Sequence, residues 1–324
     1  MTDAEIHTPV MLERTLELLA PALGREGAHV IDGTLGMGGH AEAMLRAHPA
    51  LRLIGIDRDL DAIEIARARL EFAADRVTIV HAVYDEIGRA LEAAGVERVT
   101  AVLLDLGVSS LQLDRAERGF AYSKDAPLDM RMDRTAERTA ATVIAEATEG
   151  ELRRIFQEYG EEKLAPRYAR RIVEARELEP IRTSARLVEV IAEATPAAAR
   201  RAGHPAKRVF QALRIEVNGE LEALRRGLPA ALEALEVGGR IVVLAYQSLE
   251  DRIVKRELAA RSASTAPAGL PVELPEHRPE FRLLVRGAEL ADAAEQARNP
   301  RATPVRLRAA ERLRDTGAAR QEAA

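Results

Sequence analysis

The chain has 324 residues, enough to bury a large core in two domains or in one domain with a sizeable insertion. An apolar fraction of 47% fits a soluble globular protein, and no run approaches the roughly 18 apolar residues of a membrane span. Cysteine is absent, which excludes disulfides, thiolate metal sites and covalent catalysis through cysteine. The N-terminal segment carries acids where a signal peptide carries bases, so we expect a cytoplasmic protein without membrane association.

The net charge of −5 is distributed unevenly along the chain. Residues 1–110 hold 10 Arg against 18 acidic residues, whereas residues 164–210 hold 10 basic residues against 5 acidic ones. Residues 298–324 are also basic. An acidic half with basic segments elsewhere fits a protein that meets phosphate on one face, although solvated helical faces explain the same counts.

Strands alternate with helices over the first 110 residues. The apolar runs predict strands at 28–32, 51–57, 76–82 and 99–105, with helices near 40–48, 59–72 and 86–94. Continuous apolar strands that alternate with helices are typical of a parallel, doubly wound α/β sheet.

A glycine-rich segment, Asp32-Gly-Thr-Leu-Gly-Met-Gly-Gly-His40, joins the first strand to the next helix. Its glycines, Gly36 and Gly38 among them, allow close approach of the backbone to a ligand and direct helix N–H groups at it. Asp57 ends the second strand, where a carboxylate can bind both ribose hydroxyls of an adenosine-containing cofactor. The pair indicates a dinucleotide or S-adenosylmethionine (SAM); Ala41 at the third glycine position tilts the choice away from NAD.

The strand–helix alternation stops near Ser110. Residues 110–135 are loop-like and residues 139–195 give only helical signals, followed by one long helix from about Pro205 to Arg226. A strand at 238–246 follows a tight turn, then a helix at 249–261 and two late strands at 281–285 and 304–308. Two late strands that close a parallel sheet are typical of SAM-dependent methyltransferases. Residues 262–276 and 315–324 are predicted to be a flexible loop and a frayed tail.

Several motifs follow one another in a fixed order along nearly the whole chain. They include Leu103–Asp114, Arg118–Tyr122, Pro127–Asp133, Tyr159–Glu162, Phe210–Ile215 and Ser248–Lys255. With them, the chain resembles the MraW-type family of ribosomal RNA small subunit methyltransferases.

That resemblance implies SAM-dependent methylation of N4 of a cytidine in the decoding region of 16S rRNA, with the small ribosomal subunit as partner. The implied fold is a class I SAM-dependent methyltransferase: a Rossmann-like, mostly parallel seven-stranded sheet with an inserted all-helical domain. We expect the core at 1–112 and 206–312, the insertion at 113–205 and the tail at 313–324. A homodimer is expected only by analogy with the family.

Residues carried over by motif form the expected cofactor site. They are Gly36, Gly38, Gly39, His40, Asp57, Tyr84, Asp105 and Gln112. The chain departs from the family at Gln247, usually histidine, at Leu111, usually proline, and at Tyr84, usually phenylalanine. Two residues keep a second interpretation: His40 can act through its backbone N–H alone, and Tyr84 can fill core instead of stacking on adenine.

Asp105 and Ser109 are the expected catalytic residues, on the loop after the fourth strand. The N4 amine of cytosine is a poor nucleophile, so acceptors must hold its N–H bonds while nitrogen attacks the methyl group directly, without a covalent enzyme intermediate. The base must leave its stack, which is easiest in single-stranded or loop RNA.

Basic and polar side chains are expected to hold the RNA backbone. The candidates are Arg131, Lys207, Arg208, Gln211, Arg214 and Arg301. Each can instead belong to a solvated face. Asp129 and Asp133 flank Arg131; an ion-paired loop is favoured there over a metal site, and no metal is expected.

Two other functions remain compatible with the sequence. The fold is shared with methyltransferases that act on DNA or protein. Gln247 and Tyr84 also leave room for a SAM-binding RNA assembly factor that does not catalyse methyl transfer.

Overall fold

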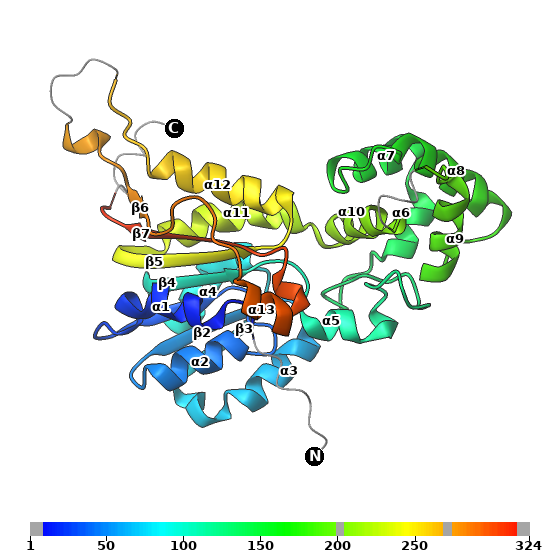
Figure 1. Cartoon of the computed structure of the whole chain (residues 1–324). Helices are drawn as coiled ribbons and strands as arrows, with labels where there is room; N and C mark the ends of the chain where they lie inside the picture. Colours follow the sequence, from blue (N-terminus) through cyan, green and yellow to red (C-terminus); the bar gives the residue numbers. More distant parts are fainter. Residues whose placement is uncertain (1–8, 199–203, 268–273, 316–324) are drawn as a thin grey trace. The chain divides into compact units, whose positions relative to one another are not determined.

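The computed structural model describes residues 9–198, 204–267 and 274–315, and Figure 1 traces the chain. The chain forms two compact units, one from residues up to Gly107 and from Glu222 onward, the other from Val108–Leu221. The predicted insertion, 113–205, lies inside the second unit, which also takes in 108–112 and 206–221, predicted for the core. Within the described residues, none of the helices combines the length and apolar character that crossing a bilayer requires.

The first unit is built on a seven-stranded sheet of order β3-β2-β1-β4-β5-β7-β6. The strands are β1 (His29–Asp32), β2 (Arg52–Asp57), β3 (Val77–His81), β4 (Val99–Asp105), β5 (Leu235–Ala245), β6 (Phe281–Leu283) and β7 (Arg306–Arg312). The first five are mutually parallel, and β7 pairs antiparallel with both β5 and β6. The predicted class I fold, with two late strands closing a parallel sheet, is confirmed.

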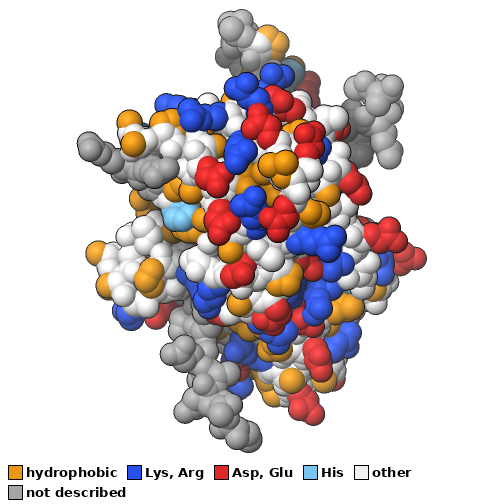
Figure 2. Space-filling view, turned by 90° about the vertical axis from the view of Figure 1, so that its right-hand side faces the viewer, with side chains coloured by type: hydrophobic (Ala, Val, Ile, Leu, Met, Phe, Trp, Pro, Cys, Tyr) orange, Lys and Arg blue, Asp and Glu red, His pale blue; other side chains and the backbone are white. Residues whose placement is uncertain are grey.

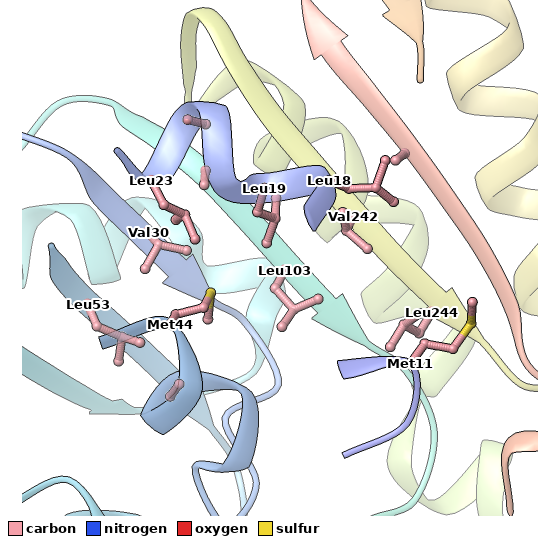
Figure 3. Close-up of a cluster of buried hydrophobic side chains, with 14 of the residues drawn as sticks. Met11, Leu18, Leu19, Leu23, Val30, Met44, Leu53, Leu103, Val242 and Leu244 are labelled. Carbon is pink, nitrogen blue, oxygen red and sulfur yellow. The ribbon is translucent and has the colours of Figure 1, made fainter. Parts of the chain in front are cut away.

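Alternate residues of the central strands point to opposite faces of the sheet, as the two-residue period of a strand requires. Val30 and Leu103 pack in one hydrophobic cluster, and their neighbours Ile31 and Leu104 pack in the other. Figure 3 shows the first cluster, in which Leu19 of a covering helix approaches the strand side chains. Both faces are buried, which explains why the strands are apolar throughout.

Helices cover both faces of this sheet. The first cluster includes residues of α1 (Leu12–Leu23), α2 (Gly39–Ala47) and α3 (Leu60–Arg69). The second includes residues of α4 (Ile87–Ala94), α11 (Glu220–Glu233) and α12 (Ser248–Arg261). A short helix, α13 (Ala293–Arg298), lies between β6 and β7 in the chain. The sheet is therefore the middle layer of three.

Glycines explain two differences from the predicted elements. The predicted helix from Pro205 to Arg226 is two helices, α10 (Ala206–Asn218) and α11, because Gly219 adopts a φ of 59° that ends the first. The strand predicted to begin at Gly238 after a tight turn begins earlier instead, as β5 at Leu235, so Gly238 lies inside it. Gly238 has a φ of 77°, and the pairing of β5 with β4 shifts register there, as in a β-bulge.

The second unit is helical in its described residues. It contains α5 (Ser110–Asp114), α6 (Ala140–Glu146), α7 (Glu149–Glu158), α8 (Ala165–Leu178), α9 (Ser184–Ala194) and α10. Thr139, Thr148 and Thr183 cap the starts of α6, α7 and α9 with their side chains. Helix α10 was predicted for the core, but Val209 and Phe210 pack in the hydrophobic cluster of this unit.

The predicted flexible loop and tail fall partly on residues 268–273 and 316–324, which lie outside the described residues.

Candidate active site

The glycine-rich segment between β1 and α2 has the backbone geometry that was expected of it. Gly36 and Gly38 adopt φ values of 52° and 78°, which side chains disfavour. Gly39 is needed for a different reason: a Cβ there would lie 2.6 Å from Cγ of Pro9. The loop therefore holds the segment before α1 in place, a contact that the sequence alone did not reveal.

Asp57 stabilises this loop from the end of β2. Its Oδ2 accepts a hydrogen bond from the backbone N–H of Gly36 at 2.7 Å, and its Oδ1 accepts one from Asp59 at 2.8 Å. Burial raises the pKa of the Asp57 carboxyl, and the two backbone N–H groups partly offset that effect. Each oxygen keeps a second lone pair, so the carboxylate can still accept from ribose hydroxyls.

Asp32, at the end of β1, is a site residue that the sequence analysis missed. Its side chain is 2% exposed, and burial raises the pKa of this carboxyl to about 7, with further contributions from Asp105 and Asp57. Three carboxylates thus lie at the ends of neighbouring parallel strands, β2, β1 and β4. Its place just before the glycine loop was the available signal.

Asp105 ends β4 and receives a hydrogen bond from Tyr246. The Tyr246 hydroxyl donates to Oδ1 of Asp105 at 2.8 Å, and burial raises the pKa of Tyr246 well above its usual value. Burial also raises the pKa of Asp105 to about 7, although 27% of its side chain remains exposed. Tyr246 was not among the expected site residues, but it follows β5, the strand paired with β4.

His40 is buried beside Asp105 and is held in one tautomer. Its Nε2 lies 3.2 Å from the carbonyl oxygen of Val10, so Nε2 carries the proton. Burial lowers the pKa of His40 to about 4, which leaves Nδ1 with a free lone pair at neutral pH. Nδ1 lies 3.9 Å from Oδ2 of Asp105. Two acceptors therefore face each other beyond hydrogen-bond distance.

Tyr84 lies half-buried against helix α11. A Cβ on Gly227 would lie 2.7 Å from Cδ2 of the Tyr84 ring, so the ring and this helix are in close contact. The ring also packs at the margin of the second hydrophobic cluster. One side of Tyr84 thus belongs to the core, and its expected stacking on adenine stays a prediction.

Ser109 and Gln112 belong to the second unit, at the start of α5. The Ser109 hydroxyl accepts from the Gln112 N–H at 3.3 Å, and the Gln112 side chain accepts from the Ser109 N–H at 3.1 Å. Gln112 is 4% exposed. This capping box orients both side chains for a structural purpose, and their expected catalytic and cofactor contacts stay predictions.

Two of the expected RNA-binding arginines are engaged by carboxylates. Arg131 makes two hydrogen bonds of 2.7 Å to Asp129, and Arg214 binds Glu220 through two bonds of 2.8 and 2.9 Å. The neighbouring arginine lowers the pKa of Asp129. This pairing is the ion-paired loop that was favoured over a metal site. Arg301 lies in the first unit, half-buried before β7.

The other candidates lie on α10. Gln211 donates to the carbonyl of Tyr159 at 3.0 Å, and Arg208 donates to the carbonyl of Glu161 at 2.8 Å. Lys207 is exposed. Figure 2 shows a face on which Lys and Arg side chains lie interspersed with Asp and Glu, without a broad patch of one sign.

The strand order, the glycine loop after β1 and the carboxylates that end β2 and β4 define a class I SAM-dependent methyltransferase. The residues suit the cofactor, because three carboxylates at one edge of the sheet complement the positive charge of a sulfonium. The chain belongs to the MraW methylase family, whose sequence pattern matches residues 4–313. S-Adenosylmethionine is the cofactor, as predicted.

Close relatives carry one common name, ribosomal RNA small subunit methyltransferase H. The protein of Clavibacter michiganensis subsp. michiganensis is 72% identical over 310 residues, which cover 96% of this chain and 98% of the relative. The protein of Leifsonia xyli subsp. xyli is 66% identical over 96% of this chain and 95% of the relative. That of Thermobifida fusca is 62% identical over 97% and 96%, respectively.

Proposed function

We propose that this protein methylates N4 of a cytidine in the decoding region of 16S rRNA, with the small ribosomal subunit as substrate. Membership of the MraW methylase family and the name of its close relatives support a small-subunit rRNA substrate. The observation that carries the choice of atom is the pair of acceptors formed by Asp105 and His40. An exocyclic amine has two N–H donors and fits such a pair, whereas a carbonyl oxygen does not.

Asp105 holds and then receives a proton in this proposal. Within the described part of the chain, its Oδ2 accepts no hydrogen bond, so it can accept one N–H of the amine. Holding that bond turns the nitrogen lone pair toward the methyl group that the bound cofactor supplies on its sulfonium. Because the pKa of Asp105 is about 7, the carboxylate is also matched to take up the proton that the methylated amine releases.

Tyr246 positions this carboxylate, and His40 supplies the second acceptor beside it. The Tyr246 hydroxyl fixes Oδ1, and the neutral imidazole of His40 presents Nδ1 to Oδ2. Because His40 donates to a backbone carbonyl through Nε2, its ring cannot reverse these roles. Asp105 therefore keeps one oxygen directed at the substrate.

The RNA is held through the helical unit in this proposal. Lys207 is exposed, and Arg208 uses one nitrogen for a backbone carbonyl, which leaves other donors of its guanidinium for phosphate. Arg131 and Arg214 are favoured as structural ion pairs, because a phosphate would have to displace a bidentate carboxylate from each.

The test uses small ribosomal subunits from cells that lack this protein. The purified protein is incubated with methyl-labelled SAM, the RNA is digested, and the labelled nucleoside is identified by mass spectrometry. We expect label in N4-methylcytidine from 16S rRNA, and a loss of label with Asp105→Asn while SAM binding persists. Label in another nucleoside or in duplex DNA, or SAM binding without any label, contradicts the proposal.

A further inference from the structure

The peptide group between Val10 and Met11 is held at both ends by residues far away in sequence. Its carbonyl oxygen accepts from Nε2 of His40 at 3.2 Å, and its N–H donates to Oε1 of Glu295, in α13, at 2.5 Å. Val10 and Met11 are 6% and 4% exposed, so this peptide group lies largely out of water. Because a trans peptide group is planar and rigid, its C=O and N–H point in opposite directions and can only turn together.

Met11 adopts a backbone conformation that its side chain disfavours. It begins α1 with a φ of 51° and a ψ of 36°, in the left-handed region. Asn and Asp can stabilise this region through a local hydrogen bond, but a methionine side chain cannot. Turning the Val10–Met11 peptide group by half a turn would return the φ of Met11 to negative values, where most residues lie. The two hydrogen bonds therefore hold the peptide group against a relaxation of the backbone.

The orientation of this peptide group decides which nitrogen of His40 carries the proton. With the Val10 carbonyl facing the ring, Nε2 is the donor, and Nδ1 is left as an acceptor 3.9 Å from Oδ2 of Asp105. If the peptide group turned, the Met11 N–H would face Nε2, and the neutral ring would carry its proton on Nδ1 instead. That N–H would then donate to Asp105 and occupy Oδ2.

We propose that Glu295 is a positioning residue for methyl transfer, which fixes the Val10–Met11 peptide group and thereby keeps Nδ1 of His40 an acceptor. The inference rests on the proposed function, in which Nδ1 of His40 and Oδ2 of Asp105 accept the two N–H groups of the target amine. Without Glu295, the two groups would bond to each other, and the site would lose both acceptors at once.

The structure offers a matched control for this role. The connection between β6 and β7 that carries Glu295 also binds α1 through Glu289, whose two carboxylate oxygens accept from Arg14 at 2.9 and 3.1 Å. This ion pair joins the same two segments without bonding to the Val10–Met11 peptide group. A general loosening of these segments would appear in variants of both glutamates, whereas the proposed role belongs to Glu295 alone.

The experiment determines the tautomer of His40 in the protein without RNA. Histidine is labelled with ¹⁵N, and NMR at neutral pH correlates the ring nitrogens with the ring protons; His40 is assigned from the signals lost in His40→Asn. We expect the proton on Nε2 in the wild-type protein, and a change of about tenfold in the ratio of the tautomers toward Nδ1–H in Glu295→Ala. Glu295→Gln keeps an oxygen acceptor and should keep the wild-type tautomer, as should Glu289→Ala.

The kinetic counterpart uses small ribosomal subunits as substrate. We expect kcat to fall about tenfold in Glu295→Ala, because fewer molecules carry the acceptor pair, and to be largely restored in Glu295→Gln. Glu289→Ala should keep the wild-type kcat. Circular dichroism reports whether each variant is folded; if Glu295→Ala is not, Glu295→Met, which is longer and also lacks the oxygen acceptor, takes its place.

The outcomes separate this inference from the proposed function. If the wild-type protein forms no N4-methylcytidine, the proposed function fails, whatever the tautomer of His40. If it does form this product, but the proton of His40 stays on Nε2 in Glu295→Ala, the role of Glu295 is overturned. An equal change in Glu289→Ala, or a changed tautomer with an unchanged kcat, overturns it as well.

Discussion

Tyr246→Phe removes one donor from Asp105 and should move the pH dependence of methyl transfer. The hydroxyl bonds the ionised carboxylate at 2.8 Å and lowers the pKa of Asp105 from where burial alone would place it. A hydrogen bond to a charged group contributes about 1.5–3 kcal/mol. Because 27% of the Asp105 side chain is exposed, we take the lower end of this range, which raises the pKa by about one unit.

The size of the effect follows from the ionised fraction of Asp105. With a pKa of about 7, half of the carboxyl is ionised at pH 7; raising the pKa to about 8 leaves roughly a tenth ionised, so kcat/KM should fall about fivefold. At pH 9 both proteins are more than roughly nine-tenths ionised, and the difference should nearly vanish.

The assay measures initial rates with small ribosomal subunits between pH 5.5 and about 9.5. This range covers the expected ionisation of Asp105 in both proteins. The matched control is Tyr168→Phe, which removes a buried hydroxyl bonded to Thr195 in the helical unit. It should lower stability without moving the acidic limb, on which the rate rises as Asp105 ionises. A Tyr246→Phe profile that is reduced equally at every pH, or not at all, refutes the assigned role of the Tyr246–Asp105 hydrogen bond.

Three stability predictions follow from the same structure. Burial raises the pKa of Asp32 from 3.8 to about 7. The free energy of unfolding therefore falls as the pH rises from 3.8 to about 7, because the folded protein must then bury a charge. Asp32→Asn should add about 2–4 kcal/mol to the free energy of unfolding at pH 8 and little at pH 4, as measured by urea titration. An equal effect at both pH values would contradict the buried charge. Gly39→Ala places a Cβ 2.6 Å from Pro9 and should cost about 1–3 kcal/mol in thermal unfolding, whereas Gly88→Ala, with open space around it, should be neutral or stabilising. Gly219→Ala, at a φ of 59°, should lower the free energy of unfolding by about 1–2 kcal/mol. An unchanged free energy of unfolding would show that the backbone between α10 and α11 adopts another conformation without strain.

The sheet could be predicted from the sequence because burial on both faces makes its strands continuously apolar. Ile31 and Val30 serve opposite faces, yet both must be apolar, so the run is visible without the structure. The boundary between the two units was harder to predict from the sequence. Helix α10 has an apolar stripe that fits either unit, and only the packing of Val209 and Phe210 assigns it to the second.

The candidate site could be predicted where a residue's place in the chain or its motif pointed to a role. Asp57 was suggested by its place at the end of a strand, whereas Asp105 and His40 belong to motifs of the family that the chain resembles. Tyr246, which bonds Asp105, was not predicted, and neither was the bond of His40 to the carbonyl of Val10, because both bonds join residues far apart in sequence. No local pattern in the sequence encodes those bonds. For the same reason, the sequence does not show which arginines are already paired with carboxylates.

The three carboxylates at the ends of the parallel strands differ in what their surroundings leave available. Asp57 binds backbone N–H groups through both oxygens and so anchors the glycine loop. Asp32 is 2% exposed, and its pKa of about 7 means that its charge depends on what lies beside it. Asp105 has a similar pKa, but 27% of its side chain is exposed. Asp57 is thus committed to the glycine loop and Asp32 is enclosed, whereas Asp105 remains open to a substrate amine.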